Sequence, residues 1–485
     1  MFAAFDNFPA LLIWLPLAGG LISFFIKSEK GARASAIVFS LLTMAVMMTS
    51  LFFSSSESFV YNQVSYVWLP NLGSSFGLIL DGLTRVLCLL TALVFPMVFL
   101  LVPGNRYPNA NRFYALMLLT QCGLMGVFMA TDALVFYLFW ELALIPVYFL
   151  ASIWGGEKRI KASFKFFIYT FVGSLFLLIG ILYMYLKTSN GSFSLVAFYN
   201  VKLSDVEQYW MFLLFFIAFA IKMPLFPLHT WQPEAYEQAP TPVTMVLSAV
   251  MVKMGLYGVM RWLMPLFPNA FSAHSNFVVI LSVIGILYAS FIAIRQDDMK
   301  RLIAYSSIAH IGLMSAALFA NNEIGAQGVL IQLFSHGVNV LGLWIIADII
   351  EQQTGTRSLK EMGGLAKQNP TLGILLVGFA FANIALPLTN AFVGEFLMFN
   401  SLFQFKPWIA AAAGVSVVLA AIYTLNMVQK CAYGEVSEKM SKMQAPNMPA
   451  QFVLIVLLIV VIISGVYPAP LFDLTADTLQ QLFIK

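Results

Sequence analysis

The chain has 485 residues, of which 60% are hydrophobic and only 10% are charged, and its formal net charge is +4. Soluble globular domains carry roughly 25% charged residues, so this composition excludes a soluble enzyme and indicates a protein whose surface faces lipid. Hydrophobic segments follow one another without a soluble block, and we therefore expect a single membrane domain over residues 1–485.

A helix that crosses a bilayer needs about 20 mostly apolar residues, and this criterion predicts about fourteen transmembrane helices. The first lacks a preceding basic region and a small-residue cleavage site, so we expect it to be retained and not removed as a signal peptide. The predicted spans are 8–26, 36–54, 78–102, 111–130, 132–154, 164–186, 209–228, 242–263, 276–294, 301–319, 325–349, 371–397, 408–429 and 451–468.

The positive charges support this count and orient the chain, because cytoplasmic loops collect Lys and Arg. With the N-terminus outside, eighteen of the 26 Lys and Arg residues fall in cytoplasmic loops and five fall outside. Only Arg85, Lys222 and Lys253 remain inside spans and more than two residues from a span end. We therefore expect both termini on the outer side, which is the periplasmic side if the membrane is a bacterial inner (cytoplasmic) membrane.

Ionisable side chains inside a span are unfavourable, so they persist when they are paired, hydrated or functional. Asp132 and Asp348 lie near span ends, where a structural and a functional role both stay open. Asp81 and Arg85 are four residues apart on one helical face, so a local ion pair explains them as well as function does.

Six other side chains are the candidate site, because they lie within apolar runs and far in sequence from any obvious partner. The two histidines among them can also be read as uncharged groups that form hydrogen bonds between helices. A desolvated lysine can titrate near neutral pH, since burial lowers its pKa from about 10.4 to about 5–6 and a nearby carboxylate raises it again. The set therefore predicts a track for an ion, in the first place a proton. Its members are Glu141, Lys222, Lys253, His310, His336 and Glu395.

Two of the predicted spans are interrupted. Residues 223–233 hold three prolines, too many for a continuous helix, and residues 381–395 hold a second break. Corresponding breaks in two halves of a chain are typical of inverted-repeat transporters, in which irregular backbone lines a cavity. We expect two inverted five-helix repeats, 111–263 and 276–429, each with a broken helix. Prolines that merely kink two helices are the alternative.

The three cysteines, Cys88, Cys122 and Cys431, are far apart and show no paired spacing. Neither a disulfide framework nor a metal cluster is expected from them. The sequence also lacks a Gly-rich dinucleotide turn and a haem-binding motif, so we expect this chain to bind no redox cofactor and no metal.

Several motifs follow one another along nearly the whole chain. They are FWEL at 139–142, IPVYFL at 145–150, AIKMPLFPLHTWQPEA at 220–235, QAPT at 238–241, KMGLYG at 253–258, AYSSIAHIG at 304–312 and FVGEF at 392–396. In this order they resemble the antiporter-like membrane subunits of respiratory complex I. Within that family the chain is most similar to the M branch, the counterpart of mitochondrial NADH dehydrogenase chain 4, because the sister branches L and N and the related sodium/proton antiporter subunits usually carry lysine where this chain has Glu395.

The resemblance implies a proton-translocating subunit of NADH:quinone oxidoreductase, a translocase in which this chain is a non-redox part. It implies that Glu141 pairs with Lys222 and that Lys253 is the central proton carrier. His310 and His336 would continue the polar axis toward Glu395.

NADH, FMN, iron–sulfur clusters and quinone would then be held by partner subunits. The expected partners are the L- and N-type antiporter-like chains, small membrane subunits and the lipid bilayer, and no nucleic acid is expected. Two alternatives stay open. One is a subunit of a multi-subunit sodium/proton antiporter or membrane-bound hydrogenase, which the proteins that copurify with the chain would decide. The other is a single-chain solute carrier.

Overall fold

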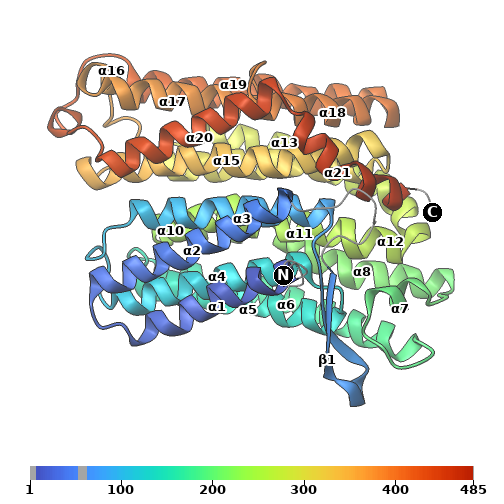
Figure 1. The fold of residues 1–485 in the computed structure, drawn as a ribbon. Coiled ribbons are helices and arrows are strands. Elements are labelled where there is room, and N and C mark those ends of the chain that lie inside the picture. Colours follow the sequence, from blue (N-terminus) through green and yellow to red (C-terminus); the bar gives the residue numbers. More distant parts are fainter. Residues whose placement is uncertain (1–6, 53–62, 484–485) are drawn as a thin grey trace.

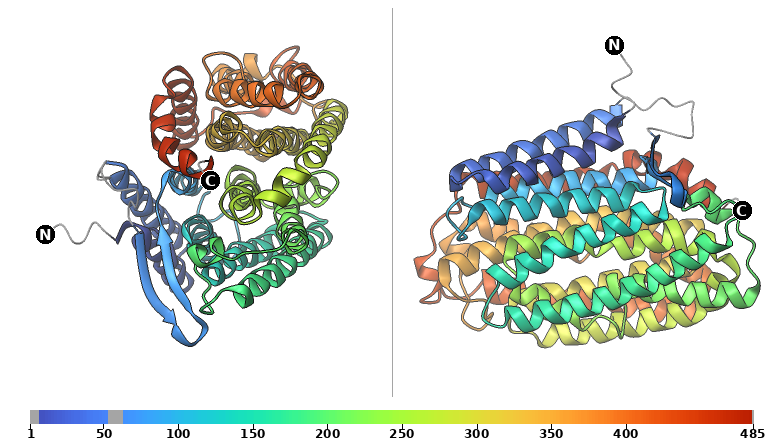
Figure 2. Two further views of the ribbon diagram at one scale, coloured as in Figure 1. Left: turned by 90° about the vertical axis from the view of Figure 1, so that its right-hand side faces the viewer. Right: turned by 90° about the horizontal axis from the view of Figure 1, so that it is seen from below.

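The computed structural model describes residues 7–52 and 63–483 as a bundle of long helices whose axes run close to parallel (Figures 1 and 2). Within these residues, twelve helical segments are long and apolar enough to cross a membrane. They are α1 (Phe8–Phe25), α2 (Glu29–Phe52), α3 (Gly82–Leu101), α4 (Ala110–Met129), α5 (Ala133–Trp154), α6 (Arg159–Lys187), the composite helix Thr241–Leu266, α13 (Pro268–Arg295), α14 (Met299–Phe319), α15 (Glu323–Thr354), α19 (Pro407–Ala432) and α20 (Met448–Val466).

The two remaining predicted spans correspond to interrupted helix pairs. The first pair is α8 (Asp205–Lys222) and α9 (Trp231–Gln238), and the second is α17 (Pro370–Asn383) and α18 (Asn390–Phe405). The chain is therefore an all-helical multi-pass membrane protein in its spanning part, as predicted. The count of fourteen crossings and the assignment of the two breaks to inverted repeats over 111–263 and 276–429 stay predictions.

The composite helix Thr241–Leu266 is buried except for the partly exposed Arg261 and Pro265, and it is not regularly wound. It consists of α10 (Thr241–Val246), the π-helical segment η3 (Leu247–Met251), α11 (Lys253–Gly258), the π-helical segment η4 (Val259–Leu263) and α12 (Met264–Leu266). π-Helical turns inside α-helices are rare and frequently occur at functional sites. Here they flank Lys253 on both sides.

Several elements lie outside the predicted spans. Strands β1 (Gln63–Leu69) and β2 (Ser74–Ile79) form an antiparallel hairpin, with Val64 opposite Leu78. An amphipathic helix, α21 (Ala469–Phe483), packs on α3 and α15 near the same end of the bundle as the hairpin (Figure 1). The short helices are η2 (Pro70–Leu72), α7 (Leu195–Tyr199), α16 (Leu365–Gln368) and η5 (Met440–Lys442).

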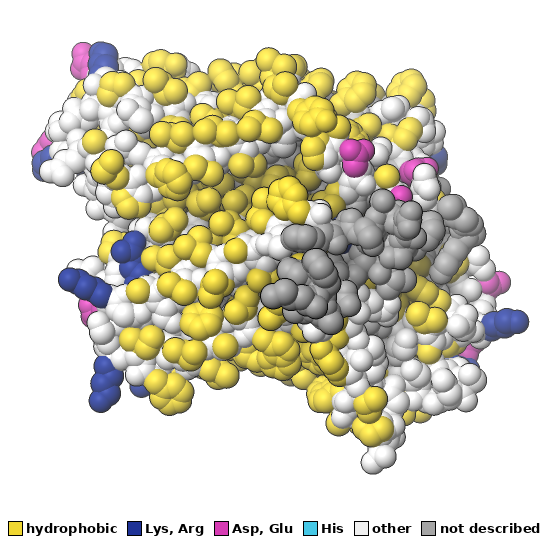
Figure 3. Space-filling view, viewed as in Figure 1, with side chains coloured by type: hydrophobic (Ala, Val, Ile, Leu, Met, Phe, Trp, Pro, Cys, Tyr) yellow, Lys and Arg dark blue, Asp and Glu magenta, His cyan; other side chains and the backbone are white. Residues whose placement is uncertain are grey.

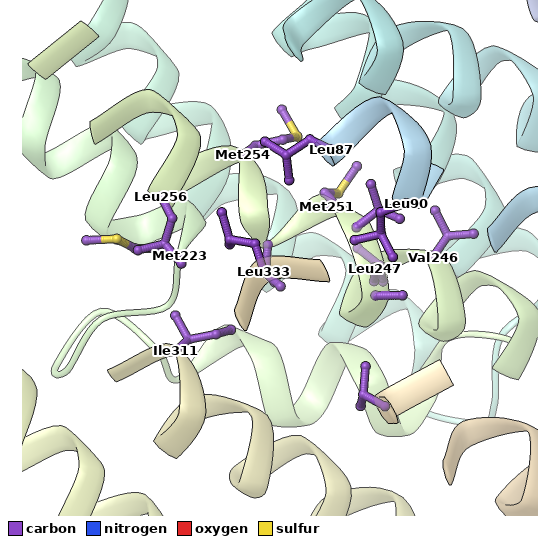
Figure 4. Close-up of a cluster of buried hydrophobic side chains, with 14 of the residues drawn as sticks. Leu87, Leu90, Met223, Val246, Leu247, Met251, Met254, Leu256, Ile311 and Leu333 are labelled. Atoms are coloured by element: carbon purple, nitrogen blue, oxygen red, sulfur yellow. The ribbon is translucent and has the colours of Figure 1, made fainter. Parts of the chain in front are cut away.

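Charged side chains gather at the two ends of the bundle, and the band between them is hydrophobic (Figure 3). This distribution fits a belt of lipid around the helices, since charges inside the hydrocarbon layer are unfavourable. The centre of the bundle is apolar as well. Figure 4 shows buried side chains of α3, the composite helix, α14 and α15 packed together, among them Leu247, Met251 and Leu333.

Candidate functional site

Lys253 lies at the centre of the bundle, and its side chain is fully buried. Its ammonium nitrogen donates a hydrogen bond to the backbone carbonyl of Ser248 over 2.6 Å. The same nitrogen lies 3.0 Å from Nδ1 of His336 on α15. A π-helical turn shifts the backbone hydrogen-bond register, so a carbonyl within it can bond to a side chain. The winding of η3 thus helps to hold a lysine in an apolar core.

Two histidines and a carboxylate continue the line from Lys253. The rings of His336 and His310 have centroids 5.5 Å apart. On its other side, His310 Nδ1 lies 3.2 Å from an oxygen of Glu395, and Gln332 donates to the same oxygen over 3.4 Å. Four of the six predicted site residues therefore form one buried row across α11, α15, α14 and α18.

Between His336 and His310, the row contains no hydrogen bond among the described contacts. The Nε2 atoms of His310 and His336 are buried, and neither has a hydrogen-bond partner within the described part of the chain. A neutral imidazole carries a proton on one ring nitrogen and accepts on the other. Each histidine therefore has one nitrogen engaged in the row and one nitrogen available to pass a proton onward.

A second polar cluster surrounds the break between α17 and α18. Asn383 donates to the hydroxyls of Ser306 and Thr424 over 3.1 and 3.3 Å, and the Tyr423 hydroxyl donates to Ser306 over 3.2 Å. Asn383 and Tyr423 also line a small cavity with His310 and Glu395, of about 10 Å³, which is room for about one water molecule. Sequence reasoning missed Asn383 and Tyr423, because uncharged polar residues near a break are common.

Lys222 and Glu141 lie apart from the row from Lys253 to Glu395. Lys222 ends α8 where the helix breaks, and its side chain is 1% exposed with its nitrogen 5.4 Å from the ring centroid of Trp140. Glu141 follows Trp140 on α5. Both residues are described, yet no ion pair joins them, and Lys222 Nζ and one Glu141 oxygen are buried without a hydrogen bond. The structure therefore places the two charges near one another but not in contact.

A close approach of two helices links the end of α8, where Lys222 lies, to the helix that carries Lys253. Gly255 on α11 packs so tightly on the end of α8 that a Cβ there would lie 2.6 Å from the Met223 nitrogen and the Phe219 carbonyl oxygen. The backbone after Lys222 therefore touches the helix turn that carries Lys253. A movement at the break of α8 would act directly on α11.

Asp81 pairs with Arg261 of η4, and Arg85 Nε donates to the backbone carbonyl of Leu80. The local pair of Asp81 with Arg85 is one of two interpretations of the sequence, and it stays untested. Arg261, one of the five positive charges counted on the outer side, lies within η4 of the composite helix. A spacing of four residues identifies only neighbours on the same helix, whereas Arg261 is distant from Asp81 in the sequence.

Asp132 and Asp348 have structural partners. Asp132 caps the start of α5 by accepting from the backbone nitrogens of Leu134 and Val135, and it also accepts from Ser74. Asp348 forms a two-pronged ion pair with Arg106, with nitrogen–oxygen distances of 2.6 and 2.7 Å. Neither carboxylate contacts the row from Lys253 to Glu395 among the described contacts.

A cavity of about 970 Å³ opens at the end of the bundle where most of the Lys and Arg residues lie, and we call it the basic-face cavity. Its walls hold a network of ion pairs that joins the ends of α9, α14 and α15. Burial raises the pKa of Asp298, in the loop before α14, above its ordinary value, and the nearby Arg357 guanidinium opposes that shift. The pairs are Lys300–Glu351, Arg301–Glu237, Arg357–Glu237, Arg357–Asp298 and Arg357–Glu351.

Residues 130–421 match the family model described as NADH:quinone oxidoreductase/Mrp antiporter, TM. Among curated relatives, the chain is 33% identical to NADH-quinone oxidoreductase subunit M of Escherichia coli (strain K12), covering 98% of both chains. It is 34% identical to F(420)H(2) dehydrogenase subunit M of Methanosarcina mazei, covering 98% of this chain and 97% of the relative.

Solved structures give the same picture of the fold. A chain of respiratory complex I from Thermus thermophilus with bound NADH superposes with a TM-score of 0.90 at 30% identity, covering 98% of this chain and 99% of the other. A chain of the Mrp complex from Dietzia sp. DQ12-45-1b superposes with a TM-score of 0.84 at 21% identity, covering 98% of this chain and 52% of the other. At that identity the second likeness concerns the fold alone.

Proposed function

Since the chain belongs to the NADH:quinone oxidoreductase/Mrp antiporter family of membrane subunits, we propose that it is a proton-translocating subunit of NADH:quinone oxidoreductase, respiratory complex I. In this role it is a non-redox part of the enzyme. It moves protons across the membrane while quinone is reduced in another part of the complex.

The observation that carries this proposal is the buried row of Lys253, His336, His310 and Glu395. Every member can gain and lose a proton, and an unused row of this kind would be unfavourable in an apolar core. The Lys253 ammonium gives its proton to His336 Nδ1 over 3.0 Å. His336 releases a proton from Nε2 toward His310, and His310 protonates Glu395 from the nitrogen that faces it.

Glu141 and Lys222 act on Lys253 without lying in the row. Charges in a low-dielectric interior interact over longer distances than charges in water. When Glu141 approaches Lys222, the lysine charge is compensated and a proton on Lys253 is favoured. When the two separate, as in this structure, the Lys222 charge disfavours a proton on Lys253 and drives it toward His336.

The proposed function also includes the partner subunits, the membrane and the orientation of the chain in it. NADH, FMN, iron–sulfur clusters and quinone are held by partner subunits, which include L- and N-type antiporter-like chains and small membrane subunits. The membrane is the bacterial inner membrane. The basic-face cavity faces the cytoplasm, because cytoplasmic ends collect Lys and Arg, and both termini lie on the periplasmic side.

One test decides the central claim. NADH-driven proton uptake is measured in inverted membrane vesicles from cells that carry wild-type chain or Lys253→Met, normalised to the amount of assembled complex. We expect uptake to be lost with the methionine variant. Undiminished uptake would contradict the proposed function.

A sodium/proton antiporter or membrane-bound hydrogenase subunit is the second candidate, since related folds occur in the Mrp complex. Glu395 disfavours it, because antiporter subunits usually carry lysine there. The proteins that copurify with this chain on a blue-native gel distinguish the two. Flavin and iron–sulfur subunits that oxidise NADH support the first assignment, and their absence from the intact complex supports the second.

A further inference from the structure

The break between α17 and α18 has a strained backbone conformation. Ala385 and Leu388 have φ angles of 53° and 75°, in the left-handed region that residues other than glycine rarely adopt. Leu388 is also 69% exposed, so burial of its own side chain does not compensate for this conformation. Strained backbone persists only where the surrounding structure fixes it, and it is concentrated at functional sites. The contacts at the two ends of the break therefore hold it in place.

On the side of α18, two contacts fix the chain where the helix begins. Ser335 of α15 donates to the backbone carbonyl of Asn390 over 3.2 Å. Gly465 of α20 packs so closely that a Cβ there would lie 2.5 Å from the Leu388 carbonyl oxygen. The start of α18, the helix that carries Glu395, is thus anchored to α15 and α20.

On the side of α17, one asparagine joins three helices. Asn383 is the last residue of α17, and its amide nitrogen donates to Ser306 of α14 over 3.1 Å and to Thr424 of α19 over 3.3 Å. An amide nitrogen carries two hydrogens, so both of them are used. All three side chains are buried, and a buried donor that loses its partner is unfavourable. Asn383 therefore fixes the end of α17 to α14 and α19.

Ser306 is the point at which these bonds reach the buried row. Its hydroxyl oxygen accepts from Asn383 and also from the Tyr423 hydroxyl of α19, over 3.1 and 3.2 Å. His310 follows four residues later, so it lies one turn further along the same face of α14. Two donors from two other helices thus fix α14 one turn before His310, whose Nδ1 lies 3.2 Å from Glu395.

We propose that Asn383 and Tyr423 are positioning residues, which act through Ser306 to keep His310 in contact with Glu395. This inference rests on the proposed function and adds two residues that hold the row in place without carrying its proton. The helix of Glu395 is fixed from α15 and α20, whereas that of His310 is fixed from α17 and α19. A contact between partners that are held from different helices is lost when either anchor is released.

Tyr423→Phe is the mildest test, because it removes one hydroxyl and leaves the ring. We expect NADH-driven proton uptake by inverted vesicles, per assembled complex, to fall about two- to tenfold, the factor that corresponds to one net hydrogen bond. Asn383→Leu should lower it further, since it releases two bonds and one end of the strained break. Tyr114→Phe is the control, because Tyr114 is a similarly buried tyrosine that donates to the Val102 carbonyl, outside the row. Undiminished uptake in Asn383→Leu would overturn the proposal.

Ser306→Ala tests whether the effect passes through Ser306. Among the described contacts, the Tyr423 hydroxyl bonds to Ser306 alone. Adding Tyr423→Phe to Ser306→Ala should therefore lower uptake no further, whereas independent effects would multiply. Ser315→Ala is the control for the serine change, since Ser315 is buried on the same helix and accepts from Ser282 over 3.2 Å. A double variant whose loss equals the product of the two single losses would exclude the shared action.

Few titratable groups surround the contact of His310 with Glu395, so its pH dependence can be interpreted. The two side chains face each other, His336 of α15 and Tyr423 of α19. The residues that α13 and α17 contribute to the same small cavity are uncharged, and so is the whole of α20. The carboxylates of α9, the remaining helix that packs on α14, pair with cations outside the row.

The pH profile of uptake distinguishes a positioning role from a merely structural one. In Asn383→Leu, which removes no titratable group, we expect the pH of half-maximal uptake to shift by about one unit, since a hydrogen bond between ionisable groups is worth about that much. A lower rate with an unchanged profile would show that Asn383 only stabilises the fold, and would overturn its positioning role. If Asn383→Leu does not assemble, the profile of Tyr423→Phe and the Ser306 double variant decide.

Lys253→Met, measured in parallel, separates this inference from the proposed function. Normal uptake and a normal profile in the Asn383 and Tyr423 variants, with uptake lost in Lys253→Met, would exclude the positioning residues and leave the function standing. Normal uptake in Lys253→Met would exclude the function itself.

Discussion

The side-chain nitrogen of Lys253 lies 3.0 Å from Nδ1 of His336, although the two residues are 83 positions apart in the chain. At this distance the lysine and the histidine cannot both be charged without strong repulsion in an apolar core. A proton on one of them therefore disfavours a proton on the other. In the proposed function, the pair would act as a single site that passes its proton along the row.

Lys253→Met should lose most proton uptake, because methionine has a similar length and no group to protonate. Lys253→Arg should also pump poorly, since arginine keeps its charge and hardly ever releases its proton. Proton uptake by inverted vesicles, normalised to complex content, measures both. The exposed Lys202→Met is the control, and uptake in Lys253→Arg equal to that of wild type would exclude a carrier that must discharge.

Glu141→Ala and Lys222→Ala should each abolish most pumping while the complex still assembles. Either change leaves a buried charge that no partner can compensate when the helices move. Because no ion pair joins the two described side chains here, we expect the effect on pumping to exceed the effect on thermal stability. The comparison is proton uptake against the melting temperature of the purified complex, with the exposed Glu438→Ala as control. A large loss of stability with normal pumping would show that the pair is structural.

Glu395 should tolerate Asp better than Gln, because a titratable group is needed beside His310. Glu395→Gln keeps size and hydrogen bonding but cannot gain or lose a proton. Glu395→Lys should retain part of the activity, since it restores a titratable group of opposite charge type. The readout is proton uptake normalised to complex content, with the exposed Glu323→Gln as control. Wild-type uptake in the Gln variant would make Glu395 a structural polar residue.

Asp348→Ala should destabilise the protein without a specific effect on pumping. The side chains of Arg106 and Asp348 are only 13% and 11% exposed, and removing one partner of a buried pair costs about 3–5 kcal/mol. Replacing both, as in Arg106→Met with Asp348→Leu, should recover most of the loss, since no charge is then left unpaired. The measurement is the thermal unfolding of the purified complex, together with proton uptake per assembled complex. A single variant as stable as wild type would contradict the assignment of the pair to stability.

Site residues and helix breaks could be predicted from the sequence where a residue type is unfavourable in its surroundings. Lys253 and Glu395 could be singled out because a charge within an apolar run requires a reason, and the two helix breaks were visible because proline and asparagine interrupt a helix. The contact of Lys253 with His336 could not be predicted, since it depends on how α11 and α15 pack. The same limit explains why the pairing of Asp81 with Arg261, 180 positions away, could not be predicted.

Other features were missed because their sequence signal is ordinary. The hairpin of β1 and β2 lies in a segment too short to span a bilayer, so a search for about 20 apolar residues passes over it. The π-helical segments have the composition of an α-helix, so nothing in the sequence distinguishes them. Asn383 and Tyr423 are single polar residues whose partners lie on other helices.

The π-helical segment η3 determines how this chain responds to the deletion of a single residue. In a regular helix each residue turns the chain by about 100°, so deleting one residue rotates everything beyond it to a different face. A π-helical turn already holds one residue more than an α-helical turn, so deleting one residue from η3 would restore regular winding and leave Lys253 directed toward His336. The Ser248 carbonyl would then return to a backbone hydrogen bond and no longer accept from the Lys253 ammonium. Single-residue deletions within 247–251 should therefore be tolerated for insertion and assembly, and rejected under growth conditions that depend on respiration.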